Sequence, residues 1–213
     1  MDITWLGHSC FRIRGREATI VANPCPPSTG YNIGKPTADI VTISDTDENN
    51  KYVKAVAGKP VIISNPGEYE IHDVFITGIR TNGGTPDDPE TKRNLVFIIE
   101  LEGLRVCHLG SLGGSPTAEQ AEEMTGVDIL LIPVGGGDDV VDGAKAAEIA
   151  SLLEARIIIP MRFKTDVSKD GLDSPDRFLK ELGASAGEAQ PKLSVNRSTV
   201  PTETKVILLD YKR

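Results

Sequence analysis

Residues 38–51 read ADIVTISDTDENNK, an apolar segment that runs straight into acidic and amide side chains. The part from 39 to 44 carries no charge after its first residue, which predicts a buried strand. In an α/β protein, the side chains that follow such a strand lie at the carboxyl edge of the sheet, where open α/β sheets bind their ligands. The stretch therefore predicts a sheet-based fold and the place of its functional site.

The side chains after this strand are rich in oxygen atoms. They are Asp45, Asp47, Glu48, Asn49 and Asn50. Such a cluster can bind a cation, accept the side chain of an arginine, or form a solvated turn that caps the next helix. From these residues alone, all three interpretations stay open.

The rest of the chain predicts strands in meanders first and strands alternating with helices later. We expect strands over 2–7, 10–14, 18–22, 61–64, 69–71, 74–79, 95–101, 105–109, 128–133, 156–160, 192–195 and 205–210. We expect helices over 51–57, 117–124, 144–153 and 174–182, and a surface loop over the proline- and glycine-rich residues 23–37. Because no linker separates two compositions, we expect one domain over 1–213, of class α/β (α+β), with helices covering mixed sheets.

Composition narrows the classes of partner. The 213 residues carry a formal net charge of −8 and no stripe of Lys or Arg, which argues against nucleic acid and anionic membranes as partners. No apolar run approaches the ~20 residues that span a bilayer, and Met1 leads directly into a strand without a signal peptide. The three cysteines form no CxxC pair, so we expect a reducing, cytoplasmic location rather than a disulfide framework.

Six segments in this order resemble the metallo-β-lactamase superfamily, in particular its small Zn-dependent-hydrolase-like branch with the ascorbate-6-phosphate lactonase-like proteins. They are TWLGHSCFRI (4–13), ADIVTIS (38–44), NPGEYEIHDVFITGI (65–79), VCHLGSLG (106–113), VDILLIPVGG (127–136) and IIIPMRFKT (157–165). The resemblance implies a four-layer αββα sandwich of two mixed sheets flanked by helices. It also implies a site at one edge, between the two sheets.

The same resemblance implies a metal centre whose ligand positions are changed in this chain. The superfamily has a His-x-His-x-Asp-His run after the strand at 39–44, a histidine from a later loop, a bridging aspartate and a last histidine. The corresponding residues here are Asp45, Asp47, Asn49, Asn50, Asn82, Ser111 and Arg162, and Asn23-Pro24 replaces a supporting Asp-Pro. A zinc site needs imidazole, thiolate or carboxylate ligands, so the resemblance implies a degenerate metal site.

The histidines add one candidate for the site. His8 lies in the GHS turn at the rim implied by the resemblance, where it could bind a ligand or serve as a hydrogen-bonded turn histidine. We expect His72 on a surface turn and a structural role for His108. A Cys107–His108 nucleophile pair is excluded, because adjacent residues on a strand point to opposite faces.

These observations lead to one hypothesis and one alternative. The first is a pseudoenzyme without metal or cofactor, in which Arg162 fills the vacated centre, pairs with Asp45 or Asp47, and leaves a role in binding a small molecule or a protein. The alternative is a hydrolase of phosphoesters or lactones that uses a divalent cation held by Asp45 and Asp47. Neither involves nucleic acid or a membrane, and a homo-oligomer is left open.

Overall fold

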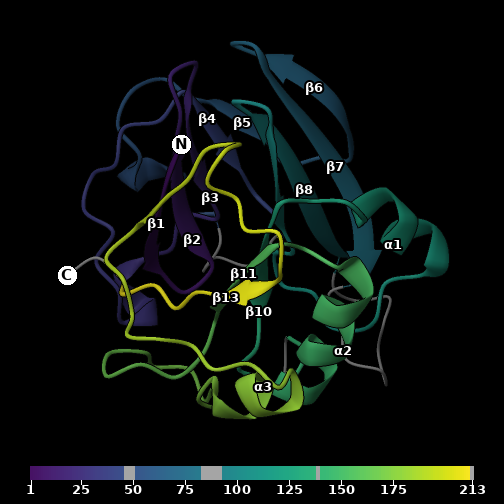
Figure 1. Cartoon of the computed structure of the whole chain (residues 1–213). Helices are drawn as coiled ribbons and strands as arrows, with labels where there is room; N and C mark the ends of the chain where they lie inside the picture. Colours follow the sequence, from purple (N-terminus) through teal and green to yellow (C-terminus); the bar gives the residue numbers. More distant parts are fainter. Residues whose placement is uncertain (46–50, 83–92, 138–139, 212–213) are drawn as a thin grey trace.

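The computed structural model describes residues 1–45, 51–82, 93–137 and 140–211. Within these residues, the chain folds into two mixed β-sheets that face each other (Figure 1). The sandwich of two mixed sheets expected from the sequence is confirmed.

The first sheet has six strands in the order β12-β1-β2-β3-β4-β5. Their bounds are β1 (Asp2–Gly7), β2 (Cys10–Arg14), β3 (Thr19–Ala22), β4 (Ile40–Thr42), β5 (Val61–Ile63) and β12 (Leu193–Ser194). Pairing is antiparallel from β12 to β3 and parallel from β3 to β5. Because β3, β4 and β5 are parallel, the ends of β3 and β4 lie at the same edge of the sheet.

The second sheet has seven strands in the order β13-β11-β10-β9-β8-β7-β6. Their bounds are β6 (Gly67–Ile71), β7 (Val74–Asn82), β8 (Arg93–Leu101), β9 (Leu104–His108), β10 (Ile129–Pro133), β11 (Ile157–Met161) and β13 (Lys205–Val206). The strands β9, β10, β11 and β13 are parallel, and β6 to β9 are antiparallel. The loops after β9, β10 and β11 therefore leave the sheet at one edge.

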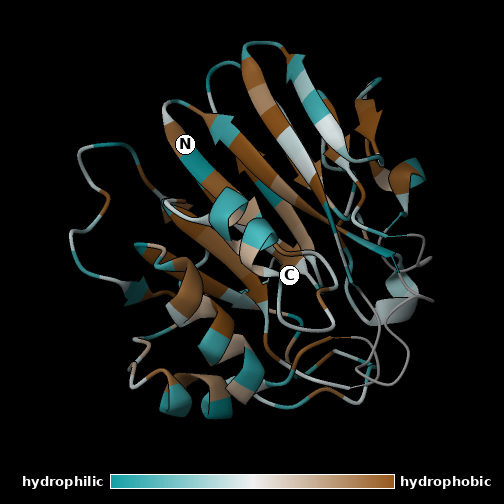
Figure 2. Cartoon of the chain, turned by 90° about the vertical axis from the view of Figure 1, so that its right-hand side faces the viewer, coloured by the Kyte–Doolittle hydropathy of each residue, from teal (hydrophilic) through white to brown (hydrophobic). Residues whose placement is uncertain are grey.

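The main core lies between the two sheets. Ile3, Trp5, Phe11 and Ile13 alternate along β1 and β2 and are fully or almost fully buried in it. They pack with apolar residues of the second sheet, such as Phe97. Figure 2 shows the same pattern, with hydrophobic residues concentrated in the strands and hydrophilic ones on turns and outward helix faces. This inward alternation is the one expected from the sequence.

The described residues form three α-helices, all beside the seven-stranded sheet (Figure 1). They are α1 (Ala118–Met124), α2 (Gly143–Leu153) and α3 (Asp176–Glu181). α1 begins with a capping box between Thr117 and Gln120, and the Asp142 side chain caps α2. α2 contacts β10 and both other helices. No helix in the described part of the chain is long and apolar enough to cross a membrane.

The outer face of the six-stranded sheet is covered in a different way. A second apolar cluster joins Leu6, Cys10 and Val21 of this sheet to Tyr31 and Ile33 of the preceding loop region. The proline- and glycine-rich segment 23–37 was predicted to be a surface loop, yet several of its side chains are buried here. The segment contains the 3₁₀-helix η1 (Pro27–Thr29) and serves as the covering layer that the apolar outer side chains of the sheet require.

Several elements differ in extent from the sequence expectation. The helix predicted over 51–57 is a single 3₁₀ turn, η3 (Val53–Ala55), because so short a segment with β-branched valines gains little from helix propagation. The strands expected over 192–195 and 205–210 are only two residues long, as β12 and β13. β7 extends to Asn82 and β8 begins at Arg93, so both reach further toward the polar connection between them than expected.

Candidate functional site

The two sheets meet at the edge where β4 ends, and the backbone of Ser44 is held there by two hydrogen bonds. The backbone N–H of Ser44 donates to the side-chain oxygen of Asn23, at 2.8 Å. The carbonyl oxygen of Ser44 accepts from the N–H of Leu95 in β8, at 2.6 Å. Asn23 is fully buried and adopts a φ of 45°. Asn23, which the resemblance places where the superfamily has a supporting aspartate, therefore fixes the backbone of Ser44 just before Asp45.

A second buried amide, that of Asn94, organises the end of β9. Its Nδ2 donates to Thr81 Oγ1 at 2.9 Å and to the carbonyl of Leu109 at 2.8 Å. Its Oδ1 accepts from the N–H of Ser111 at 2.8 Å. All the polar atoms of this side chain are thus satisfied, and together they set where the backbone of Ser111 lies.

Gly110 lets the backbone after β9 pass close to the side chains of Asn94 and Ser44. Its φ is 62°, in the left-handed region. A Cβ atom at this position would lie 2.4 Å from Asn94 Oδ1 and 2.5 Å from the Cβ of Ser44. Since such contacts are far inside van der Waals range, only glycine allows the ends of β4, β8 and β9 to meet here.

Arg162 lies at this edge, directly after β11. The residue is only 4% exposed, and its Nη1 donates to the hydroxyl of Ser111 at 2.8 Å. Its backbone has a φ of 48°, and its N–H donates to the carbonyl of His8 at 3.4 Å. A Cβ on Gly135 would lie 2.1 Å from the carbonyl oxygen of Arg162, so the glycine-rich loop after β10 packs directly on this backbone. The guanidinium is thereby placed at the edge between the two sheets.

His8 adds an imidazole to the same region. Its ring is 1% exposed, and its Nε2 lies 3.3 Å from Oδ2 of Asp170. The hydrogen bond from His8 lowers the pKa of Asp170, and the nearby charge of Arg162 lowers it further. The carbonyl of His8 accepts from the indole N–H of Trp5 at 2.9 Å, which fixes the turn. The site therefore combines a guanidinium, an imidazole, a carboxylate and a hydroxyl.

The buried side chain of His108 connects two backbone segments next to the site. The N–H of Gly110 donates to its Nδ1 at 3.1 Å, so Nε2 carries the proton and donates to the carbonyl of Ser9 at 2.9 Å. Burial lowers the pKa of His108 to about 4. A neutral histidine with both nitrogens engaged in backbone contacts has a structural role, as the sequence led us to expect. It holds the β1–β2 turn against the end of β9.

The structure brings together three of the residues singled out from the sequence. His8, Ser111 and Arg162 meet at one edge. Asp45 is half-buried just after Ser44, whereas Asp47, Asn49 and Asn50 lie outside the described residues. The pairing of Arg162 with Asp45 or Asp47 stays a prediction.

Asn82 lies at the end of β7 with an exposed side chain. Its carbonyl accepts from the N–H of Gly113, at 3.1 Å. This bond connects its backbone to the loop after β9.

Two residues of the site were missed in the sequence. Asn94 follows a long polar stretch, and nothing marks it as buried except that an apolar strand begins at the next residue. Asp170 lies in the sequence KTDVSKDGLD (164–173), which reads as an exposed turn. A loop can approach a site from far along the chain, so periodicity carries no signal for such a residue.

Comparison with known proteins identifies the family. The profile of the β-lactamase superfamily domain matches residues 2–162. The chain belongs to this superfamily. A crystal structure from Thermotoga maritima, described as a candidate Zn-dependent hydrolase of the metallo-β-lactamase superfamily, is 38% identical, with a TM-score of 0.81. The match covers 98% of this chain and 97% of that one.

Two further relatives align with most of this chain. A UPF0173 protein of Pyrococcus furiosus is 29% identical, over 85% of this chain and 90% of its own length. A UPF0173 metal-dependent hydrolase of Thermoplasma acidophilum is 28% identical, over 88% of this chain and 92% of its own length. These similarities support a shared fold. The hydrolase activity in two of the names describes the relatives, because a shared fold does not establish a shared function.

Proposed function

We propose that this metallo-β-lactamase-fold protein works without a metal centre and that its cleft binds a small molecule or a protein rather than hydrolysing it. The observation that supports this proposal is the buried guanidinium of Arg162, which donates to the Ser111 hydroxyl. In the superfamily pattern these two positions belong to a histidine and a bridging aspartate. Under this correspondence, a permanent cation would stand where the metal ion of the superfamily is coordinated.

The chemistry of these side chains does not fit a zinc centre. A guanidinium stays protonated in proteins and has no lone pair to offer a metal, and its positive charge repels one. The Ser111 hydroxyl is a weak neutral ligand compared with the carboxylate it replaces. Within the residues that the structure describes, no group of three His, Cys, Asp or Glu side chains is arranged to hold an ion. We therefore derive no reaction step through a metal.

The remaining groups suit recognition of a polar ligand. Arg162 and His8 supply donors, and Asp170 supplies an acceptor, at the edge where the parallel strands end. Hydrogen bonds to charged groups are strong enough to select a ligand by its charge. The proposal makes the protein a pseudoenzyme, and we place it in the reducing cytoplasm because its three cysteines form no CxxC pair.

A second candidate is a divalent-metal-dependent hydrolase of phosphoesters or lactones. It is favoured by the acidic residues after β4, including Asp45 and Asp47, because Mg²⁺ and Ca²⁺ prefer oxygen ligands. The names of the UPF0173 relatives also favour it. Under this alternative, Arg162 would orient a substrate rather than replace the ion.

Metal analysis separates the two candidates. The protein is purified without chelator, and zinc, iron, manganese, calcium and magnesium are measured per chain by mass spectrometry. The proposal expects well under one bound ion per chain and a melting temperature that EDTA leaves unchanged. About one tightly bound ion per chain, together with lower stability in EDTA and turnover of a phosphodiester or lactone, would overturn it.

A reconstruction variant tests the physical reason. It replaces the altered positions by the superfamily residues: Asp45→His, Asp47→His, Asn49→Asp, Asn50→His, Ser111→Asp and Arg162→His. We expect this variant to bind zinc, because imidazole and carboxylate ligands are restored on the same frame. The same variant with Arg162 kept is the matched control. If that control also binds zinc equally well, the guanidinium is not what excludes the metal.

A further inference from the structure

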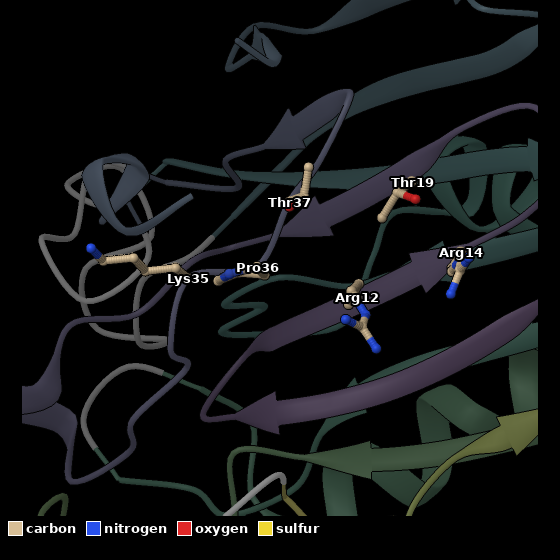
Figure 3. A pocket seen from close by; sticks show the side chains of 6 residues that line it. All are labelled: Arg12, Arg14, Thr19, Lys35, Pro36 and Thr37. Atoms are coloured by element: carbon tan, nitrogen blue, oxygen red, sulfur yellow. The ribbon is translucent and has the colours of Figure 1, made fainter. Parts of the chain in front are cut away.

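A basic pocket lies on the outer face of the six-stranded sheet. It has a volume of about 360 Å³, and its walls come from β2, the start of β3 and the segment before β4. The residues that line it are Arg12, Arg14, Thr19, Lys35, Pro36 and Thr37. Figure 3 shows the guanidinium groups of Arg12 and Arg14 on the same side of β2, with Lys35 at the opposite end of the pocket.

The strand geometry explains why the two arginines share one face. Arg12 and Arg14 alternate with Phe11 and Ile13, which point into the core between the sheets. Arg14 pairs with Thr19 of β3 across the strands. The two guanidinium groups are therefore carried by a strand in the body of the sheet rather than by a loop.

The facing wall is also fixed by backbone hydrogen bonds. The N–H of Ala57 donates to the carbonyl of Pro36 at 2.8 Å, and residue Thr37 forms a parallel bridge with Ala57. Lys35 extends from this anchored segment. Its side chain is exposed and therefore free to change rotamer.

The charges of this pocket are unbalanced. No Asp or Glu lines it, although the whole chain carries 31 acidic and 23 basic residues. Within the described residues, no ion pair involves Arg12, Arg14 or Lys35, and the buried Nε of Arg12 has no hydrogen-bond partner. The adjacent carboxylate of Asp39 is engaged by the N–H of Thr19, at 2.8 Å.

Like charges on one face of a sheet destabilise it, and a buried donor without a partner costs free energy. An anion in the pocket would relieve the repulsion between the like charges. Two guanidinium groups and an ammonium match the charge and the several acceptor oxygens of a phosphate group better than those of a single carboxylate. The pocket volume is at the lower end of the range for small-molecule sites, roughly 300–1,000 Å³.

We propose that this pocket binds a small molecule that bears a phosphate monoester or a pyrophosphate, with Arg12 and Arg14 donating to the phosphate oxygens. The net charge of −8 makes a nucleic acid an unfavourable occupant. The site is separate from the cleft: His8 and Ser9 precede β2 at the cleft end, and Arg14 is at the other end, beside the turn closed by Gly15 and Ala18. It does not depend on the function proposed for the cleft.

Isothermal titration of the full chain with pyrophosphate and with phenyl phosphate tests this proposal. We expect saturable binding of one molecule per chain. Arg12→Ala and Arg14→Ala should each weaken the affinity about tenfold or more, the effect of losing one charge-assisted hydrogen bond. Arg12→Lys should recover part of the loss, since it keeps the charge without the planar fork of donors.

Arg80→Ala is the matched control. Arg80 is an exposed strand arginine of β7 in the other sheet, and its removal changes the net charge by the same amount. We expect this variant to bind like the wild type. Circular dichroism checks that each variant is folded. If the Arg12 variants do not fold, the affinity of Arg14→Ala, at an exposed position, tests the proposal.

Four results would overturn the proposal, three of them obtained with the small phosphate probes. The first is the absence of saturable binding with either phosphate probe. The second is an equal loss of affinity in Arg14→Ala and Arg80→Ala, which would show a general effect of net charge. The third is binding that survives Arg14→Ala but disappears in Arg162→Met, which would place the anion in the cleft. Binding of heparin alone, with no response to the small probes, would likewise contradict a small-molecule site.

Discussion

Replacing Arg162 with methionine removes the charge of the site while keeping most of the aliphatic volume. Arg162 is 4% exposed and donates to Ser111 Oγ at 2.8 Å. A hydrogen bond from a charged donor contributes about 1.5–3 kcal/mol, and removing one partner from a buried charged network costs about 3–5 kcal/mol. We therefore expect Arg162→Met to lower the free energy of unfolding by about 2–4 kcal/mol.

Urea unfolding at pH 7, followed by circular dichroism, measures this loss. For a chain of this length the melting temperature should fall by about 5–12 °C. A double-mutant cycle with Ser111→Ala isolates the contact and should give a coupling of about 1–2 kcal/mol. Arg80→Met, on an exposed strand position, is the control and should stay within about 0.5 kcal/mol of the wild type.

The opposite sign would refute this reasoning. A guanidinium buried without adequate compensation is destabilising, and an apolar side chain of similar volume then stabilises the fold. If Arg162→Met is as stable as the wild type or more stable, the arginine is not the structural replacement for a metal ion. Its retention would then have to be explained by ligand binding.

Three further outcomes follow from the same edge. The folded-state pKa of His108 is about 4, below its unfolded value of about 6.5. The free energy of unfolding should therefore fall by up to about 3 kcal/mol as the pH drops from about 6.5 to about 4. In urea unfolding, His108→Gln should lack this part of the pH dependence. Asn94→Ala removes three hydrogen bonds and should lower the free energy of unfolding by about 3 kcal/mol, as measured in urea. Ser111→Ala should lower it by less. Gly110→Ala should lower the melting temperature by about 5 °C or more, because its Cβ would overlap Asn94. A flat pH profile for the wild type, or an Asn94 or Gly110 variant as stable as the wild type, would contradict the corresponding expectation.

The sandwich could be predicted because each strand has its own local signal in the sequence, and that signal recurs along the chain. Short apolar segments such as 129–133 and 157–161 are bounded by turn residues, and their order matches one superfamily. The resemblance implied that Ser111 and Arg162 would share a site, and in the structure both lie just beyond the ends of the parallel strands β9 and β11. Residues at the carboxyl ends of parallel strands meet for geometric reasons that a sequence displays.

Other features depended on contacts that no local pattern encodes. Asp170 reaches His8 from a loop whose sequence reads as a solvated turn. The segment 23–37 has the composition of a surface loop, but its Tyr31 is buried against Trp5. In both cases the tertiary environment decides the burial of a side chain, and a one-dimensional pattern of polarity does not contain that environment.

The amide side chains of Asn23 and Asn94 have a consequence for how this edge can change. They anchor the backbones of Ser44 and Ser111 without contributing any formal charge. The position of the backbone at this edge and the charge found there are therefore determined by different residues. Substitution at Arg162 or Asp170 can change the charge at this edge while the two asparagines keep the backbones of Ser44 and Ser111 in place, which makes the scaffold a starting point for new ligand specificities.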